Sequence, residues 1–311
     1  MHEMKRASAA GGHSVDPRVS AARLSVFSNS LLVLGKLAVG LSIHSVSIIS
    51  EAIHSGLDLV AAGIAYWSVG QAAKPADKTH RYGHGKIENL SGAAEALLIF
   101  VASAWIIFEA YHRLRYGGEV HEVTWGLVVM GGSAIINLGV SRYLMGVARR
   151  TDSMALHADA LHLSTDVYTS VGVFAGLSLL YFTGLPWLDP VVAIAVALLI
   201  MKAAFDLLRQ AIVPLTDAKL PDKEEAEIAR ILNLHASEYV EWHDLRTRKA
   251  GAERHIDLHL VAHRTQTLGY VHDLLDQIEA ELQERFPGAS VLIHPEPCAE
   301  DCAVCTARGE A

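Results

Sequence analysis

Residues 46–72 read VSIISEAIHSGLDLVAAGIAYWSVGQA, an apolar run that contains three ionisable side chains, Glu51, His54 and Asp58. The run is long enough to cross a bilayer, whose hydrocarbon core takes about 20 residues of α-helix. An ionisable side chain near the bilayer centre costs roughly 3 kcal/mol even on a lenient insertion scale, so such residues need a functional reason. The stretch therefore predicts a membrane-spanning helix with a polar site on one face.

Five further apolar stretches are long enough to span a membrane. They lie at 21–43, 89–111, 123–147, 155–183 and 187–213. The chain of 311 residues is 51% hydrophobic and only 19% charged, with a mean hydropathy of +0.27, whereas an ordinary soluble domain carries about 25% charged residues. The predicted fold class is therefore an α-helical membrane protein with six transmembrane helices, in contact with the lipid bilayer.

The distribution of charge predicts the orientation and the partners. Lys and Arg gather before the first span, in the loop at 71–88 and after the fourth span. The positive-inside rule then places both termini of this multi-pass chain in the cytoplasm. The net charge of −8 leaves no basic surface for nucleic acid, which is excluded as a partner. The predicted domains are a disordered cytosolic N-terminus at 1–18, a transport domain at 19–215, a cytoplasmic domain at 216–297 and a Cys-containing tail at 298–311.

After the sixth span the composition becomes that of a soluble domain. Amphipathic stretches at 221–235 and 268–286 predict helices, and runs at 239–246, 254–262 and 290–294 predict strands. This order predicts a small α+β sandwich. The sequence has no GxxxxGK[ST] phosphate loop, no HExxH helix, and no nucleophile or base beside a cofactor motif. These absences argue against a nucleotide-driven pump and against a membrane enzyme.

The polar pattern of the second span recurs in the fifth, where Asp159, His162 and Asp166 repeat its three-then-four spacing. Each helix then carries carboxylate, imidazole and carboxylate on one face. Two HxxxD pairs supply four nitrogen and oxygen ligands, which suits a tetrahedral ion, most commonly zinc. The alternative is two polar faces that bond to each other inside a packed bundle. Glu51 and Asp159, the first carboxylates of the two sets, either line the path of the ion or support its ligands, or they cap a helix or are solvated at a helix end. The predicted metal ligands are His54, Asp58, His162 and Asp166.

Five segments together resemble the cation diffusion facilitator family, specifically its bacterial zinc-type proton antiporters. They are Ser47–Asp58 (SIISEAIHSGLD), Pro75–Glu88 (PADKTHRYGHGKIE), Ala158–Asp166 (ADALHLSTD), His243–Arg248 (HDLRTR) and Phe286–Cys298 (FPGASVLIHPEPC). The resemblance implies a homodimer of six-span protomers, each with a ferredoxin-like cytoplasmic domain, that exchange a divalent metal for protons by alternating access. The family's transport site falls on the same four ligands. Some bacterial relatives have Asp in place of His54, so this chain resembles the zinc-selective branch.

The resemblance also implies two features near the cytoplasmic face of the membrane. A second metal site falls on Asp77, His80 and His84, for which the alternative is a solvated loop with incidental histidines. Lys86 and Asp217 match a charge pair that ties the membrane domain to the cytoplasmic domain; the alternative is an ordinary exposed salt bridge, worth under about 1 kcal/mol.

In the cytoplasmic domain the resemblance implies a binuclear regulatory zinc site. Glu296 departs from the Asp usual in relatives, and its extra methylene bears on whether it can bridge two metals. The alternative is a set of scattered histidines. The matching residues are His243, His259, His272, His294 and Glu296. Three tail cysteines, Cys298, Cys302 and Cys305, form either a soft-metal site or a flexible reduced tail.

The function expected from these patterns is efflux of Zn²⁺ in exchange for protons. A metal binds deprotonated carboxylate and neutral imidazole, so metal binding displaces protons and returning protons displace the metal. Zn²⁺ is expected both as substrate and as regulatory ligand, with Cd²⁺, Fe²⁺ and Co²⁺ as alternative cargoes. A membrane metal sensor that signals without net transport is the rival function, although a sensor needs no ligands inside the membrane. Lys36 in the first span has no assigned role.

Overall fold

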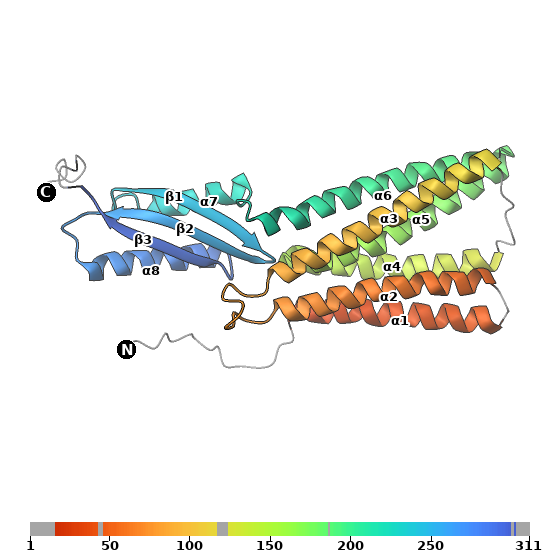
Figure 1. Cartoon of the computed structure of the whole chain (residues 1–311), viewed down its shortest axis with the longest axis horizontal. Helices are drawn as coiled ribbons and strands as arrows, with labels where there is room; N and C mark the ends of the chain where they lie inside the picture. The colour runs from red at the N-terminus through yellow and green to blue at the C-terminus, as the bar shows by residue number, and fades with distance from the viewer. Residues whose placement is uncertain (1–15, 43–45, 117–123, 186, 300–301, 303–311) are drawn as a thin grey trace.

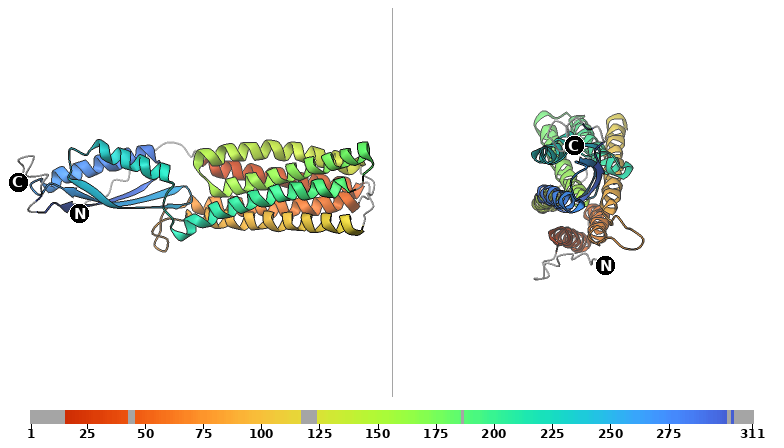
Figure 2. Two further views of the ribbon diagram at one scale, coloured as in Figure 1. Left: turned by 90° about the horizontal axis from the view of Figure 1, so that it is seen from above. Right: turned by 90° about the vertical axis from the view of Figure 1, so that its left-hand side faces the viewer.

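The computed structural model describes residues 16–42, 46–116, 124–185, 187–299 and 302. The molecule is elongated, with a bundle of long helices at one end and an α+β domain at the other (Figure 1 and Figure 2). The bundle, within the described ranges, contains the six predicted helices. They are α1 (Pro17–Ser42), α2 (Val46–Ala72), α3 (Lys86–Tyr116), α4 (Thr124–Thr151), α5 (Met154–Thr183) and α6 (Leu188–Ile212).

The helices of the bundle pack mainly in pairs. α1 lies against α2, α4 against α5 and α3 against α6, and α5 also packs on α3 and α6 (Figure 1). Small side chains occupy the contacts, since Ala65, Ala96, Ala155 and Ala204 are fully buried. Small residues let helix backbones approach closely inside a membrane, where packing and polar contacts hold helices together.

The outer surface of the bundle is strongly apolar. Phe27, Trp105, Ile135 and Leu199 are between 67% and 74% exposed, as expected of side chains that face lipid. Over the described residues, three helical segments are apolar and long enough to span a membrane by that criterion alone, namely Pro17–Ser42, Lys86–Tyr116 and Pro190–Thr216. The prediction of a helical membrane domain with six helices is confirmed.

The cytoplasmic domain follows a 3₁₀ turn at Val213–Thr216 and consists of two helices and a three-stranded sheet. β1 pairs antiparallel with β2, and β3 pairs parallel with β2 after a crossover through α8. Ile228, Leu258 and Ile278, which come from α7, β2 and α8, are almost fully buried in one core. The predicted α+β domain is confirmed. Its elements are α7 (Asp222–Leu234), β1 (Glu241–Ala250), β2 (Glu253–Ala262), α8 (Leu268–Arg285) and β3 (Ser290–Pro297).

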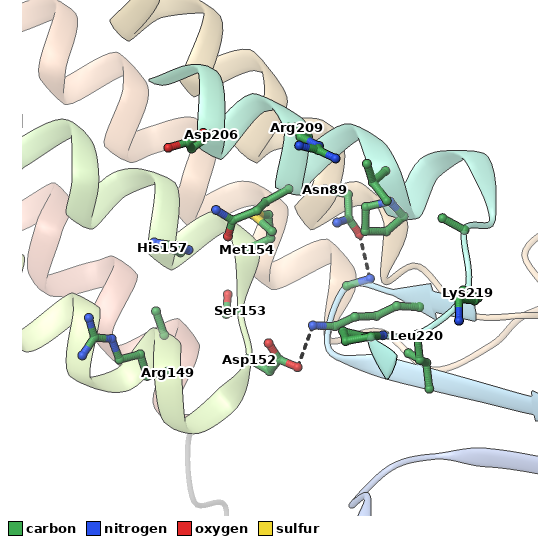
Figure 3. A pocket seen from close by; sticks show the side chains of 18 residues that line it. Asn89, Arg149, Asp152, Ser153, Met154, His157, Asp206, Arg209, Lys219 and Leu220 are labelled. Carbon is green, nitrogen blue, oxygen red and sulfur yellow. Dashed lines mark hydrogen bonds and ion pairs between the residues drawn. The ribbon is translucent and has the colours of Figure 1, made fainter. Parts of the chain in front are cut away.

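The tip of the β1–β2 hairpin contacts the membrane domain (Figure 3). Gly251, with a φ of 61°, donates its N–H to Asn89 Oδ1 at 2.7 Å. A side-chain carbon at Gly251 would lie 2.5 Å from the carbonyl oxygen of Gly85, so the two backbones meet where only glycine fits. Lys249 Nζ lies 2.6 Å from Asp152 Oδ2, beside a cleft of about 700 Å³. The hairpin is therefore fixed to the start of α3 and to the α4–α5 junction.

Candidate metal centres

The polar faces of α2 and α5 meet inside the bundle. One ligand atom each from His54, Asp58 and Asp166 lies within 4.8 Å of the others. The fourth predicted ligand, His162, lies with Nε2 3.1 Å from Asp58 Oδ1. The Asp58 carboxylate is buried and the His162 ring is nearly so, with side-chain exposures of 6% and 14%. The arrangement brings one imidazole and two carboxylates within reach of one small divalent cation, and His162 adjoins this group through Asp58.

Residues on two other helices complete the surroundings of this candidate metal site. Asn137 of α4 donates from Nδ2 to Asp166 Oδ2 at 3.2 Å, which fixes the orientation of that carboxylate. Lys36 of α1 donates from Nζ to the buried Ser55 hydroxyl at 2.8 Å, next in sequence to His54. The sequence pattern did not indicate Asn137, because a single amide in a helix gives no indication of its partner. Lys36, which had no assigned role from the sequence, thus lies beside a buried hydroxyl next to a predicted ligand.

The loop between α2 and α3 brings Asp77, His80 and His84 together. One ligand atom from each lies within 4.8 Å of the others, and the two imidazole rings have centroids 4.4 Å apart. Asp77 Oδ1 accepts the backbone N–H of His80 at 2.7 Å and both the N–H and hydroxyl of Thr79 at 2.8 Å. These hydrogen bonds, with that of His80 the largest cause, hold the pKa of Asp77 well below its usual value. The loop therefore presents an ionised carboxylate beside two imidazoles.

Three histidines form a row across the sheet of the cytoplasmic domain. His243 of β1 pairs in register with His259 of β2, which pairs with His294 of β3. Adjacent rings have centroids 5.4 and 5.0 Å apart. Glu296 places Oε1 2.8 Å from His259 Nδ1 and Oε2 3.6 Å from His243 Nε2, so its two oxygens face two different rings. The glutamate is therefore long enough to reach both histidines.

The fifth residue that the resemblance implies for the cytoplasmic metal site lies elsewhere in the chain. His272 is on α8 with a side chain that is 70% exposed, and its Nδ1 lies 3.6 Å from Asp276 Oδ1. The three-residue cluster found among the described residues contains His243, His259 and Glu296. His294 adjoins this cluster through its ring contact with His259, whereas His272 is outside it.

Lys86 and Asp217 do meet at the boundary between the domains. Lys86 Nζ lies 2.8 Å from Asp217 Oδ1, and Arg248 of β1 lies 3.4 Å from the same oxygen. The hydrogen bond from Lys86, followed by the charges of Lys86 and Arg248, lowers the pKa of Asp217. Tyr82 of the preceding loop lies beneath the Arg248 guanidinium, 4.8 Å from ring centroid to Cζ. One group of charges thus joins the start of α3, the residue that follows the 3₁₀ turn after α6, and β1.

The tail cysteines fall partly within the described residues. Cys298 is buried against Val261, and Cys302 packs on the same small apolar cluster. The backbone N–H of Arg264 lies 3.4 Å from Cys298 Sγ. Cys305 lies outside the described residues. The first cysteine is therefore part of the folded domain rather than of a tail.

Comparison with known proteins identifies relatives along most of the chain. Residues 22–216 match the family profile described as cation efflux transmembrane domain, and residues 220–298 match the profile described as cation efflux protein, cytoplasmic domain. An uncharacterized transporter of Synechocystis sp. is 35% identical over 253 residues, which are 81% of this chain and 82% of that protein. The cation-efflux pump FieF of Serratia proteamaculans is 31% identical over 275 residues, which are 86% of this chain and 89% of that pump. The solved Zn form of the putative zinc transporter CzrB is 34% identical, with a TM-score of 0.26. The match covers 27% of this chain and 96% of the solved chain.

Proposed function

The chain belongs to the cation efflux, or cation diffusion facilitator, family, and on this premise we propose that it exports Zn²⁺ across the inner membrane in exchange for protons. It is a cation efflux transporter rather than an enzyme, and a multi-pass membrane protein with a cytoplasmic C-terminal domain. In the proposal both termini lie in the cytoplasm and the protein functions as a homodimer. Protons move into the cell as the metal moves out.

The observation that carries the proposal is the meeting of α2 and α5. Their HxxxD pairs, far apart in the sequence, share one site within the helical bundle, where Asp58 and His162 are 3.1 Å apart. Two imidazole nitrogens and two carboxylate oxygens match the ligand number and types of a four-coordinate Zn²⁺ site. A carboxylate inside a membrane bundle costs free energy. Binding of a transported cation would explain why two carboxylates lie close together there.

The same ligand set supports exchange with protons. Zn²⁺ binds only deprotonated carboxylates and neutral imidazoles, so the site holds either the metal or protons. Imidazole has an ordinary pKa near 6.5, which lies in the range where a pH difference across a membrane changes its protonation. A site that opens alternately to the two sides then moves zinc outward as protons move inward.

The other two clusters have supporting roles in this proposal. Asp77, His80 and His84 stand in a loop at the cytoplasmic end of α2 and α3, where they would hold zinc that approaches the bundle. His243, His259, His294 and Glu296 would bind zinc in the cytoplasmic domain and so report its concentration. The charges around Lys86 and Asp217 connect the two domains and would transmit that signal.

Zinc flux into sealed liposomes under an imposed pH gradient tests the proposal. The purified chain is reconstituted with a zinc-sensitive dye inside the vesicles, and we expect uptake that follows the gradient and stops when a protonophore removes it. Asp166→Asn provides the transport-dead control. If the wild-type protein binds zinc in its cytoplasmic domain but gives no flux under either direction of gradient, the protein is a membrane metal sensor.

A further inference from the structure

α3 carries a buried polar stripe that none of the metal sites uses. Glu88, Ser91 and Glu95 follow each other at spacings of three and four residues, so they share one face of the helix. Glu88 and Glu95 are fully buried, and Ser91 is 5% exposed. The stripe begins near the cytoplasmic end of α3, which starts at Lys86, and leads into the bundle.

The two glutamates of this stripe have opposite surroundings. Glu88 has a full set of partners, because Oε1 lies 3.0 Å from the Arg18 guanidinium and Oε2 accepts the Ser153 hydroxyl. Glu95 has no cationic partner among the described residues. Its Oε1 accepts only a long hydrogen bond from Ser91 at 3.4 Å, and its Oε2 has no hydrogen-bond partner. An ionised carboxylate in that position is poorly compensated, since buried charge requires a counter-ion or several donors.

A second buried carboxylate faces Glu95 from α5. Asp159 is 1% exposed, and the Ser25 hydroxyl of α1 lies beside it without a hydrogen bond of regular geometry to either oxygen. The two acids repel each other electrostatically. The helices meet here through Ala96 and Ala158, the sequence neighbours of the two acids, in one apolar cluster. The other charged groups that act on Asp159 are His162 of α5 and Asp58 of α2. Two carboxylates so enclosed cannot both be ionised.

From this geometry we propose that Glu95 is a proton-binding site of the transporter, separate from the metal ligands. It holds a proton in the conformation described here and releases it when a cation occupies the transport site. The inference rests on the proposed exchange of zinc for protons. Glu95 contacts no metal ligand in the described structure, and its link to the metal is through the charge of Asp159.

The direction of release follows from the stripe. A divalent cation beside Asp58 and His162 offsets negative charge on the neighbouring acids, so the O–H bond of Glu95 breaks and leaves a carboxylate. The proton passes by way of the Ser91 hydroxyl, one turn closer to the cytoplasmic end of α3, to water at that end. Zinc that enters the site from the cytoplasm thereby drives a proton into the cytoplasm, which is the direction that zinc export requires.

Infrared difference spectroscopy of the full-length protein tests the protonation state directly. A protonated carboxylic acid has a carbonyl band that a carboxylate lacks. In wild-type protein at pH 7 we expect added zinc to remove such a band, and in Glu95→Gln we expect that loss to be absent. Glu109→Gln is the matched control, because Glu109 is an exposed carboxylate on the same helix, 3.1 Å from Arg113. Equal zinc-induced loss in Glu95→Gln and wild type overturns the proposal.

A measurement on the wild-type protein alone removes any dependence on the variant's folding. With ¹³C-labelled glutamate, the band that zinc removes must move to lower frequency, and a band that does not move belongs to an aspartate and overturns the proposal. Proton counting in liposomes gives the functional readout, with about one proton fewer per zinc expected for Glu95→Gln. Absence of zinc flux in wild type contradicts the proposed function; normal flux with an unchanged proton count in Glu95→Gln contradicts only the role of Glu95.

Discussion

His162 Nε2 lies 3.1 Å from Asp58 Oδ1, which joins α5 to α2 across 104 residues of sequence. His162 is the middle member of the carboxylate, imidazole, carboxylate set on α5, and Asp58 is the last member of the corresponding set on α2. The contact brings both sets to one point in the bundle. A relative movement of α2 and α5 would change the distance between these two atoms, so the candidate metal site and the packing of the helices are linked.

Removal of one carboxylate from this site should abolish transport. Asp58→Ala and Asp166→Ala each remove one of the two negative charges and one ligand of the proposed zinc site, and we expect zinc flux at the level of protein-free liposomes. Flux assays on protein that remains folded by size-exclusion chromatography provide the measurement. Asp206→Ala, which removes an exposed carboxylate of α6, is the control and should transport normally. Retained flux in Asp166→Ala would contradict the assignment.

The identity of residue 54 should set the preference between metals. His54→Asp adds a negative charge and a second oxygen, which tolerate longer bonds and higher coordination numbers than an imidazole does. We expect zinc transport to persist and cadmium flux to rise relative to zinc. The acid limb of the pH profile should move downward, because the ordinary pKa of aspartate lies below that of histidine. Flux of both metals between about pH 5 and 8 decides the question. An unchanged ratio and profile would mean that His54 does not bind the metal.

Zinc should stabilise the cytoplasmic domain through the histidine row. Residues 216–311 contain their own core around Ile228, Leu258 and Ile278, so the domain can be melted in isolation. At about 100 times the dissociation constant, zinc adds about 2.7 kcal/mol to the unfolding free energy. We expect the double variant His243→Ala, His294→Ala to lose most of the resulting rise in melting temperature. The control is Asp257→Ala, an exposed carboxylate of β2. A wild-type zinc shift in the double variant would refute the regulatory site.

The Lys86–Asp217 pair should behave as a coupled unit in transport. Lys86→Asp or Asp217→Lys places like charges at a contact of 2.8 Å and should reduce zinc flux. Reversal of both charges should restore part of the flux, because residues in direct contact have a non-additive interaction energy. The measurement is a double-mutant cycle on transport rates. If the effects of the two reversals on the transport rate were simply additive, the pair would be an ordinary surface salt bridge, which contributes under about 1 kcal/mol.

Stability of the cytoplasmic domain should depend on pH through His235. Burial lowers the pKa of this side chain, but hydrogen bonds to Glu281 and Glu238, at 3.1 and 3.2 Å, outweigh burial and raise it above its ordinary value. A raised pKa in the folded state means that the protonated ring contributes stability below about pH 6.5, and that this contribution is lost as the pH rises through the folded-state value. Melting of His235→Gln should therefore show a loss of about 1 kcal/mol at pH 6 and less at pH 8. An equal loss at both pH values would rule out the charged contact.

The sequence predicted the helices of the bundle well because backbone groups in lipid must bond within their own segment, which leaves a helix as the outcome of each apolar run. Helix ends were predicted less well. The third span was expected at 89–111, whereas α3 extends over Lys86–Tyr116, because a helix continues past the lipid wherever its polar ends remain solvated or packed. β1 likewise continues to Ala250, beyond its predicted end at 246, because its last residues pair with β2 at the hairpin tip.

For the candidate sites, the sequence predicted which residues share one face of a helix, but it did not predict which residues of different helices contact one another. The HxxxD repeats indicated which faces of α2 and α5 were polar. The sequence contained no indication that Asn137 of α4 would orient Asp166, or that Glu95 of α3 would face Asp159. Those contacts depend on how the helices rotate against one another, which small residues such as Ala96 and Ala158 permit but do not specify.

The meeting of Gly85 and Gly251 has an evolutionary consequence. At this point the loop that carries Asp77, His80 and His84 touches the β1–β2 hairpin through main-chain atoms, and a methyl group on either glycine collides with the opposite backbone. Substitution at one glycine cannot be relieved by a compensating side chain at the other, because neither has one to shorten. Descendants of this chain that lose either glycine must therefore also lengthen the loop or re-angle the hairpin, so the two positions should be inherited together.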